Sequence, residues 1–517
     1  MVSIVQNTTL KKEYELDDYL LIPSDIQNSQ NIKLRIVHKS AGKHFAEHTR
    51  VQVLNLNFES IGSEEISKAN IELVIASIKK KGITEGLFVV KDENGKYVNE
   101  AGLLGKKISP DIVRHTLTKS ETSFTSTGAK LDGHWPIFEK YKETGYGSII
   151  RATMTLHQVC SSRCQFCSTI GRNKKDSTTL EEAKDFVKKL YFDQSEFNRN
   201  EFPVYNEKYK KLTGSDIKLR GLILSGGGQP NLWPHFSEFV EWLADKDISL
   251  GLITNGFPKK VNEDIYNNFD WIRISITPED ASNFYPDGKF NLQYIPKNII
   301  NNPDLTLGLS YVYGPWTNDD ILKRINQASL DWNCEYVRVL TDCNLSRDFQ
   351  ILSHRDLSNK LFSLGFIDSN GEPKSRIFHQ LKYHGTKEEA VDIWDKGQCY
   401  LQTFNTFWDT TGHEENGYSY CYPCDSVTVL AEGNQEEDYN AKNIFSERKF
   451  NYDKWGTVKN TEVERLFKEK VKAYFDPRSN CSACLFQRNN KKVKELVETN
   501  QYENIKINRD IKHINFP

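Results

Sequence analysis

Strand-like and helix-like segments alternate between about residue 147 and residue 341, and this alternation limits the fold more than any other feature. Apolar, β-branched runs of strand length occur at 148–156, 219–225, 249–254, 270–276, 305–313 and 335–341. Helical patterns occur between them, at 179–193, 235–247, 261–268, 292–301 and 318–332. Strands joined through helices form a parallel sheet, and six such units favour a curved, partial (β/α)6 TIM-like barrel. The expected fold class is therefore α/β.

The length, net charge and cysteine content of the chain favour a multidomain, cytoplasmic protein. A chain of 517 residues is too long for one core, so two or three domains are expected. The net charge of −2 argues against nucleic acid as a partner, and no apolar run reaches the roughly 20 residues that span a bilayer. The start, Met1-Val-Ser-Ile, lacks the features of a secretory signal. Ten cysteines, mostly in short clusters, then favour metal or iron–sulfur ligation over disulfides.

Residues 1–146 are predicted to form a separate N-terminal α+β domain. A helix is expected at 67–81, followed by a strand at 86–90 and a hairpin at Asn94-Gly95. This order is loosely similar to the opening of ParB-like domains, but Gly102-Leu-Leu-Gly-Lys-Lys stands where their basic motif is expected. The stretch 116–128, rich in Ser and Thr, is predicted to be a linker or loop.

The remainder of the chain divides into three predicted regions. The barrel is expected to occupy 147–394, with a polar insertion at 194–217. A cysteine-rich cluster domain follows at 395–490, and a charged tail at 491–517.

Three cysteines follow the first barrel strand in the pattern CxxxCxxC. They are Cys160, Cys164 and Cys167. Three thiolates cannot supply four ligands to a cubane, so one iron of a [4Fe–4S] cluster would keep an open position for a substrate or cofactor. An alternative is a zinc site of three cysteines and His157, which precedes Cys160 by three residues.

The cysteine run, with the aromatic Phe166 before its last cysteine, resembles the signature of radical S-adenosylmethionine (SAM) enzymes. The resemblance covers about 147–350. It implies that Cys160, Cys164 and Cys167 hold a catalytic [4Fe–4S] cluster, that SAM is the cofactor, and that the backbone around Phe166 lies near adenine. It also implies an electron donor of the flavodoxin or ferredoxin type.

The segment Ser225-Gly-Gly-Gly-Gln-Pro230 follows the second strand. Bare glycine backbone lets a charged ligand approach closely. In the resembled family this segment contacts the amino group of SAM, which assigns that role to Gly226, Gly227 and Gly228. The family usually has Glu where this chain has Gln229, so the bond to an ammonium group would lack charge assistance.

Further residues stand at the carboxyl ends of later strands, where parallel α/β folds place their sites. The resemblance implies that Ser275 contacts the ribose or carboxylate of SAM and that Val312, in the stretch 308–312, packs on adenine. Arg338 could pair with the SAM carboxylate, because a planar guanidinium suits a carboxylate. Thr254 and Asn255, after the third strand, complete the predicted cofactor site.

A second cysteine set resembles the SPASM/twitch domains that bind auxiliary [4Fe–4S] clusters. Two zinc knuckles, Cys421-Tyr-Pro-Cys424 and Cys481-Ser-Ala-Cys484, are the alternative. In the one-cluster form Cys424 could replace Cys399 as a ligand, and Cys334 and Cys343 are predicted to be plain thiols. The set comprises Cys399, Cys421, Cys424, Cys481 and Cys484.

The predicted function is that of a radical SAM enzyme acting on a peptide or protein side chain, with 1–146 as a docking domain. The alternatives are a small metabolite or nucleotide as substrate and, more remotely, a non-enzymatic, zinc-stabilised binding protein. The pattern HxxEH at His44–His48 matches inverted zinc peptidases, but Val51–Leu56 already has a strand pattern, which argues against the helix that such a site needs.

Overall fold

The computed structural model describes most of the chain from residue 118 onward and, before it, the backbone of seven short strands. The described residues are 15–16, 19–28, 31–38, 48–55, 60–62, 90–91, 97–98, 118–162, 164, 166–167, 169, 173–277, 295–314, 316–342, 347–368, 371–380, 397–425, 458–471, 477, 484 and 486–517.

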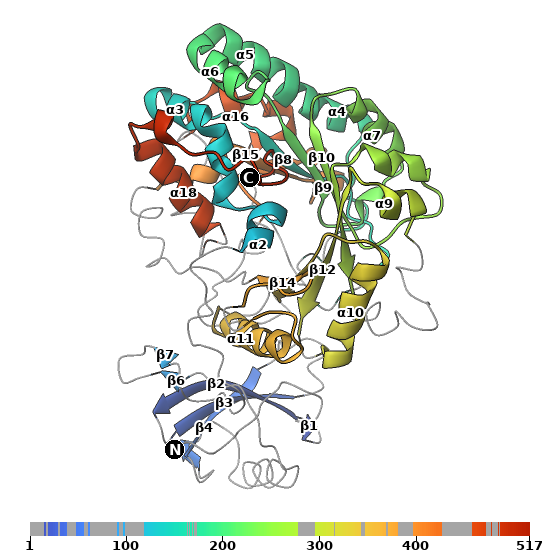
Figure 1. Ribbon diagram of the computed structural model, residues 1–517, viewed down its shortest axis with the longest axis vertical. Helices are drawn as coiled ribbons and strands as arrows, with labels where there is room; N and C mark the ends of the chain where they lie inside the picture. The colour runs from blue at the N-terminus through green and yellow to red at the C-terminus, as the bar shows by residue number, and fades with distance from the viewer. Residues whose placement is uncertain are drawn as a thin grey trace.

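The expected α/β fold is confirmed: one mostly parallel sheet of ten strands runs through the larger part of the molecule (Figure 1). All six predicted barrel strands are present, in sequence order and parallel to one another. They are β8 (Arg151–Thr155), β9 (Gly221–Ser225), β10 (Ser249–Thr254), β11 (Trp271–Ile276), β12 (Thr306–Tyr313) and β13 (Tyr336–Thr341).

Four further strands that the sequence analysis did not predict extend the sheet at both edges. Strand β14 (Ile377–Gln380) pairs in parallel with β13, and β15 (Asn405–Asp409) pairs in parallel with β8. The antiparallel strands β16 (Tyr420–Tyr422) and β17 (Val458–Lys459) follow β15. The cysteine-rich region therefore continues the barrel sheet, while the predicted boundary near residue 394 stays a prediction.

Helices cover the convex side of this sheet (Figure 1). Helix α4 begins with a capping box, in which the side chains of Thr179 and Glu182 each accept a hydrogen bond from the other residue's backbone amide. The helical elements after β8 are α4 (Leu180–Lys188), η4 (Lys189–Asp193), α5 (Gln194–Glu201), α6 (Pro203–Thr213), α7 (Phe236–Ala244), η6 (Glu263–Asn268), α9 (Lys297–Asn301), α10 (Asp319–Asp331) and α11 (Arg347–Ser363).

The predicted polar insertion at 194–217 is mostly helical, since α5 and α6 occupy most of it. Their buried faces carry the polar residues Gln194, Asn198 and Asn206, so the sequence shows no apolar helical period there. Each buried amide is hydrogen-bonded. Gln194, for example, accepts from the Ile149 amide at 2.7 Å and donates to the Ile149 carbonyl at 2.9 Å.

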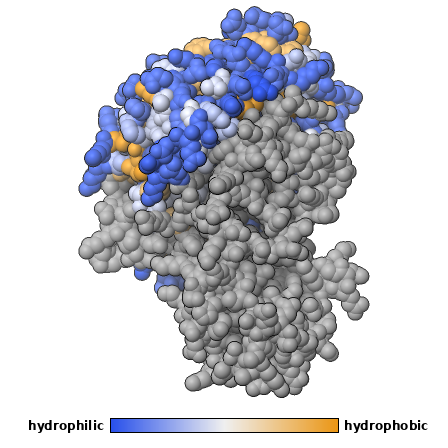
Figure 2. All heavy atoms as spheres, turned by 180° about the vertical axis from the view of Figure 1, so that it is seen from behind, coloured by the Kyte–Doolittle hydropathy of each residue, from blue (hydrophilic) through white to orange (hydrophobic). Residues whose placement is uncertain are grey.

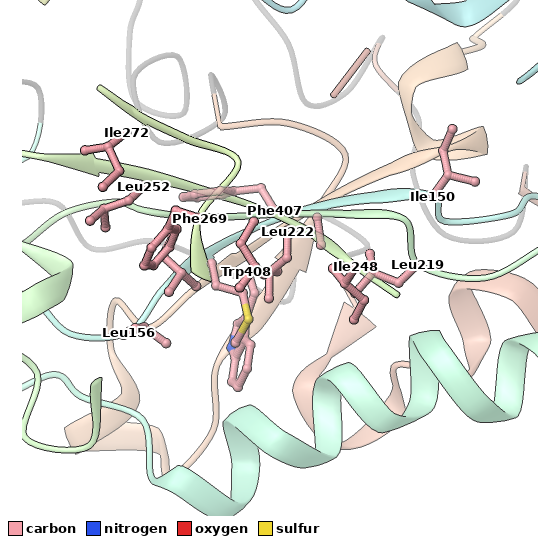
Figure 3. Close-up of a cluster of buried hydrophobic side chains, with 14 of the residues drawn as sticks. Ile150, Leu156, Leu219, Leu222, Ile248, Leu252, Phe269, Ile272, Phe407 and Trp408 are labelled. Atoms are coloured by element: carbon pink, nitrogen blue, oxygen red, sulfur yellow. The ribbon is translucent and has the colours of Figure 1, made fainter. Parts of the chain in front are cut away.

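Alternate strand residues face the helices and form the main hydrophobic core (Figure 3). In β11, Ile272, Ile274 and Ile276 belong to this core, whereas Arg273 and Ser275 lie between them and face the concave side. The same alternation holds in the neighbouring strands. It gives the sheet an apolar convex face and a more polar concave face, here called the lumen.

The last residues of the chain close one end of the lumen. Phe516 packs against Ile223 and Trp271 in a small core separate from the main one, and its ring meets the Trp271 ring edge-on at 5.4 Å. Figure 1 shows this segment within the curve of the sheet. Residues 513–517, which fall in the predicted charged tail, therefore contribute a floor to the barrel at the amino ends of its strands.

The predicted linker or loop at 116–128 is wrong for residues 118–128, the part of it that the structure describes. Helix α2 (Lys119–Phe124) begins with a capping box in which Thr118 and Glu121 exchange hydrogen bonds. Phe124 stacks on Tyr336 of β13 with ring centroids 4.4 Å apart, so this Ser- and Thr-rich segment packs under the barrel. The helix α3 (Trp135–Thr144) and α18 (Gln487–Glu498) also pack together beside it.

A second, mostly antiparallel sheet lies in the first hundred residues. The predicted hairpin is confirmed, because β6 and β7 pair antiparallel on either side of Asn94-Gly95; the predicted helix at 67–81 lies outside the described residues. His48 begins a strand, which agrees with the rejection of a helical HxxEH site. The strands are β1 (Glu15–Leu16), β2 (Tyr19–Asn28), β3 (Asn31–His38), β4 (His48–Asn55), β5 (Ser60–Gly62), β6 (Val90–Lys91) and β7 (Tyr97–Val98).

The visible described surface is largely hydrophilic, with small separate apolar patches (Figure 2). Large exposed apolar side chains, such as Phe192 and Val204, are few among the described residues. No helix in the described ranges is long and apolar enough to cross a membrane.

If Phe516 seals the lumen floor, Phe516→Ala should lower the free energy of unfolding by about 3 kcal/mol, because it leaves a cavity beside Trp271. Chemical denaturation followed by circular dichroism measures this loss. The matched control is Phe192→Ala: Phe192 is 52% exposed, and the change should cost less than about 0.5 kcal/mol. Equal effects of the two substitutions would contradict the packing role.

Candidate active site

The cysteine loop begins directly after β8, at the carboxyl end of the strand. Cys160, Cys164 and Cys167 are all partly exposed, and the Cys167 amide donates to the Cys164 carbonyl at 3.1 Å. Burial raises the pKa of the Cys160 thiol, and the neighbouring Cys167 adds to the rise. Among the described residues no three His, Cys, Asp or Glu side chains are arranged to share a single metal ion. A cubane is held differently, since each of its thiolates binds a different iron.

The glycine loop packs tightly against the strand and loop that carry the cysteines. Gly226 has φ +130°, and a Cβ built there would lie 2.1 Å from Thr155 Oγ1. A Cβ on Gly228 would lie 2.4 Å from the Val159 carbonyl oxygen. Only glycine fits at these two positions, so their first role is to let the two loops meet.

Gln229 ties three segments together. Its amide N–H donates to the Val159 carbonyl at 2.7 Å, and its side-chain oxygen accepts from Ser161 Oγ at 2.7 Å. Its side-chain nitrogen donates to the Gly256 carbonyl at 3.2 Å. This last bond needs a donor, which a carboxylate lacks. It is a physical reason for Gln at a position where the resembled family usually has Glu.

Two more side chains fasten the cysteine loop to its neighbours. Thr169 Oγ1 lies 3.2 Å from Cys167 Sγ and donates to the Gly227 carbonyl at 3.1 Å. Asn255, at the end of β10, donates to Ser161 Oγ at 3.1 Å and to Ser162 Oγ at 2.6 Å. Two of the residues predicted to contact SAM, Gln229 and Asn255, thus position the cysteine loop in this structure.

The alternative zinc site with His157 gains no support from the geometry. His157 is buried, and its Nε2 hydrogen-bonds the Gln229 carbonyl at 2.7 Å. Burial lowers the pKa of His157, which favours the neutral ring that makes this bond. The ring therefore links the first strand to the glycine loop.

The other predicted cofactor residues divide between the two faces of the sheet. By strand alternation, Ser275, Val312 and Arg338 face the lumen, and Ser275 and Val312 remain partly exposed. Thr254 lies on the opposite side, where its hydroxyl donates to Asn231 Oδ1 at 3.0 Å or to the Gly256 carbonyl at 2.8 Å. Thr254 thus holds the loop after β10.

Trp316, which was not among the predicted site residues, lies beside Phe166. Their ring centroids are 5.6 Å apart, and Trp316 Nε1 donates to the Val312 carbonyl at 3.0 Å. A Cβ on Gly314 would lie 2.4 Å from the Trp316 ring, so this glycine makes room for the indole. Phe166, Trp316 and Val312 form an aromatic edge to the site, which the Gly314-Pro-Trp316 sequence alone does not reveal.

In the second cysteine set, the structure brings Cys399 close to Cys484. Cys399 is buried. Its burial, together with the nearby Cys484 thiol, raises the pKa of Cys399 to about 12. Asn490 of α18 links the two positions, because it donates to Cys484 Sγ at 3.6 Å and accepts from the Tyr400 amide at 2.7 Å. Cys481 lies outside the described residues.

The remaining members of the set face different surroundings. Cys421 on β16 pairs in register with Trp408, interacts with Thr406 and lies within electrostatic range of Lys189. Cys424 lies near Arg151 of β8. Cys334, predicted to be a plain thiol, is fully buried, and Cys343 lies outside the described residues.

Gln229→Glu should destabilise the protein by about 1–3 kcal/mol at pH 8, because a buried carboxylate would face the Gly256 carbonyl without a proton. Burial raises the pKa of such a carboxyl. The loss should therefore shrink as the pH falls below that raised pKa, where the protonated acid can donate. Chemical denaturation at several pH values measures this, with the exposed Gln501→Glu as the control. A pH-independent difference would contradict the assigned hydrogen bond.

Comparison with known proteins gives similarity only at the level of solved structures. No protein-family model matches the chain, and no curated protein matches significantly. The structure of Streptococcus suis SuiB bound to the precursor peptide SuiA is 13% identical, covers 83% of this chain and 96% of its own, and has a TM-score of 0.37. SuiB bound to S-adenosylmethionine gives 12% identity, the same coverage and a TM-score of 0.33.

A third structure, BtrN in complex with AdoMet and 2-DOIA, is 12% identical, covers 64% of this chain and 92% of its own, and has a TM-score of 0.25. SuiB and BtrN are thus both solved with S-adenosylmethionine (AdoMet) bound. Scores this low assign neither an activity nor a substrate to the chain, so its function has to be inferred from its own residues.

Proposed function

We propose that this protein is a radical SAM enzyme that cleaves S-adenosylmethionine to a 5′-deoxyadenosyl radical and abstracts hydrogen from a substrate. The observation that carries the proposal is the junction between the cysteine loop and the glycine loop. Thr169 joins Cys167 to Gly227, and Ser161 bonds to Gln229. Two motifs separated by some sixty residues thus form one bonded surface at the carboxyl ends of β8 and β9.

The residues present fit a [4Fe–4S] cluster with one open iron. Cys160, Cys164 and Cys167 supply three thiols on one partly exposed loop, and His157 is committed to the Gln229 carbonyl. When bound, such a cluster supplies the electron for the reductive cleavage of SAM. A flavodoxin or ferredoxin is the expected donor of that electron.

The chain's own residues would bind and orient SAM beside the cysteine loop. The glycine backbone at 226–228 would receive the amino group, and Ser275 the ribose or carboxylate. Phe166 and Val312 would flank the adenine, with Trp316 shielding this edge from water. Thr254 and Asn255 would act indirectly, by fixing the loops that make these contacts.

The substrate proposed first is a peptide or protein side chain, with residues 1–146 as its docking domain. The proposed division into 1–146, 147–394, 395–490 and 491–517 follows the sequence, and a cytoplasmic location is part of the same proposal. A small metabolite or nucleotide is the alternative substrate class. The non-enzymatic, zinc-stabilised protein is disfavoured by the hydrogen bond that engages His157.

The second cysteine set is proposed to hold an auxiliary [4Fe–4S] cluster in a SPASM/twitch-like region. The proximity of Cys399 and Cys484 supports two of the ligands. Cys421 and Cys481 would complete the set, in which Cys424 could replace Cys399, and a zinc ion is the alternative occupant.

Anaerobic reconstitution should load roughly eight irons per chain, and dithionite should then yield 5′-deoxyadenosine from SAM. Cys160→Ala should remove roughly four irons and abolish cleavage. The matched control is Cys334→Ala, since Cys334 is a fully buried thiol away from both loops; it should keep its iron and its cleavage activity. Retention of SAM cleavage by Cys160→Ala would contradict the proposal.

Cys484→Ala separates the two sites. It should lower the iron content from roughly eight to roughly four while 5′-deoxyadenosine production from SAM persists. Metal analysis of the wild type identifies what the second cysteine set binds. A content of roughly four irons plus one zinc would mean that this set holds zinc instead of an auxiliary cluster, and the proposal for the catalytic site would be unchanged.

A further inference from the structure

Two arginine side chains on the lumen side of the sheet lie close enough for their positive charges to interact. Arg273 lies on β11 and Arg338 on β13, with β12 between them. Both occupy lumen-facing positions, because their neighbours in the strands belong to the main core on the other side. Neither residue belongs to the cysteine loop or to the glycine loop.

The protein satisfies these guanidinium groups only in part. The Nε atoms of Arg273 and Arg338 are buried and have no hydrogen-bond partner among the described residues. Arg338 is 8% exposed, and its Nη2 donates to Ser310 Oγ at 3.2 Å. The Tyr336 hydroxyl interacts with Arg273. Both partners are neutral, whereas a buried guanidinium is stabilised best by an anion.

The charge balance around the pair is also positive. Burial, followed by the nearby Arg273 charge, lowers the pKa of Arg338 to about 9. Among the described residues, Asp425 is the carboxylate that acts on Arg338, and Asp425 itself is solvent-exposed. One exposed carboxylate compensates the buried charge of Arg338 only weakly.

A third arginine nearby has a different task. Arg151, the first residue of β8, donates to Ser126 Oγ and to the Pro517 carbonyl, both at 2.5 Å. It thereby anchors the end of the chain that forms the lumen floor. Arg273 and Arg338 lie above this floor and remain the pair available to a ligand.

The lumen is accessible above the arginines. Ser275 and Val312 are partly exposed, as are Arg273 itself and Ile253, whereas the helix-facing residues between them are buried. Arg273 and Arg338 each lie three residues before the carboxyl end of their strand, which is a depth of about 10 Å at ~3.3 Å per residue. The cysteine and glycine loops stand at that carboxyl end.

We propose that Arg273 and Arg338 form an anion clamp that binds a carboxylate or phosphate group of the substrate deep in the lumen. The assignment of the anion to the substrate rests on the proposed function. Arg338 then serves the substrate rather than the carboxylate of SAM. It also sets the substrate class: a compound whose reacting carbon lies about two to three strand residues, ~7–10 Å, from an anionic group.

Thermal unfolding of the full chain tests the clamp without iron or SAM. Inorganic phosphate and glutarate are each titrated at constant ionic strength, with chloride as the balancing anion. At least one probe should raise the Tm of the wild type in a saturable way. A response to phosphate alone assigns a phosphate ligand, and a response to glutarate alone assigns a carboxylate.

Variants decide whether the response belongs to the clamp. Arg273→Gln and Arg338→Gln should each weaken the apparent affinity for the active probe by about 10- to 100-fold. Arg220→Gln is the matched control. Arg220 is another buried arginine of this sheet, but its guanidinium pairs with Asp247 outside the lumen, and its variant should keep the wild-type response.

Arg338→Met separates a ligand-binding role from a structural one. Without an anion its Tm should equal or exceed that of the wild type, because the variant no longer buries an uncompensated charge, and phosphate or glutarate should have no effect on it. The clamp is overturned if neither probe protects the wild type, or if the arginine variants respond as the wild type does. SAM cleavage is measured separately, so a failed clamp leaves the proposed function standing, and the converse holds as well.

Discussion

The close contact between the glycine loop and the strand that precedes the cysteines is the constraint on which the site depends. Gly226 and Gly228 leave no room for a side chain, because Thr155 and the Val159 carbonyl fill the space where a Cβ would lie. This packing places two polar loops against each other at one end of the sheet. Hydrogen bonds from Thr169, Ser161 and Asn255 then fix the cysteine loop in that place.

The sheet also shapes the site, because one of its faces is apolar and the other carries polar and charged side chains. Helix-facing positions are apolar and build the main core, so they supply most of the hydrophobic stabilisation. Lumen-facing positions include Arg273, Ser275 and Arg338, which a hydrophobic core would not tolerate. The end of the chain seals the floor of this lumen through Phe516, and the loops with the cysteines lie at its opposite end.

Much of the fold could be predicted from the sequence, for physical reasons. The six barrel strands are short segments rich in apolar and β-branched residues, and each prediction lies within three residues of the observed ends. Helices α5 and α6 were missed because Gln194, Asn198 and Asn206 fill their buried faces. Strands β14 to β17 were missed because they are short and depend on pairing with a sheet formed elsewhere in the chain.

The sequence motifs of the candidate site could be predicted, but the roles of several of its residues could not. CxxxCxxC and the triple glycine identified the two loops, yet the sequence could not tell that Gln229 and Asn255 serve these loops themselves. The sequence could not tell that Thr254 lies on the helix side of the sheet, because the face of a side chain depends on strand register. Arg273 could have been found, since it lies two residues before Ser275 and so shares its face. Trp316 carried no such signal.

Electron paramagnetic resonance of the reduced, reconstituted protein tests most directly whether the glycine loop seats SAM beside the cysteine-bound cluster. We expect the cluster signal of the wild type to change when SAM is added. Gly228→Ala should keep its iron but show no such change, because the new Cβ pushes the loops apart. A wild-type signal unaffected by SAM, or a first cysteine site that binds zinc instead of iron, would contradict the account.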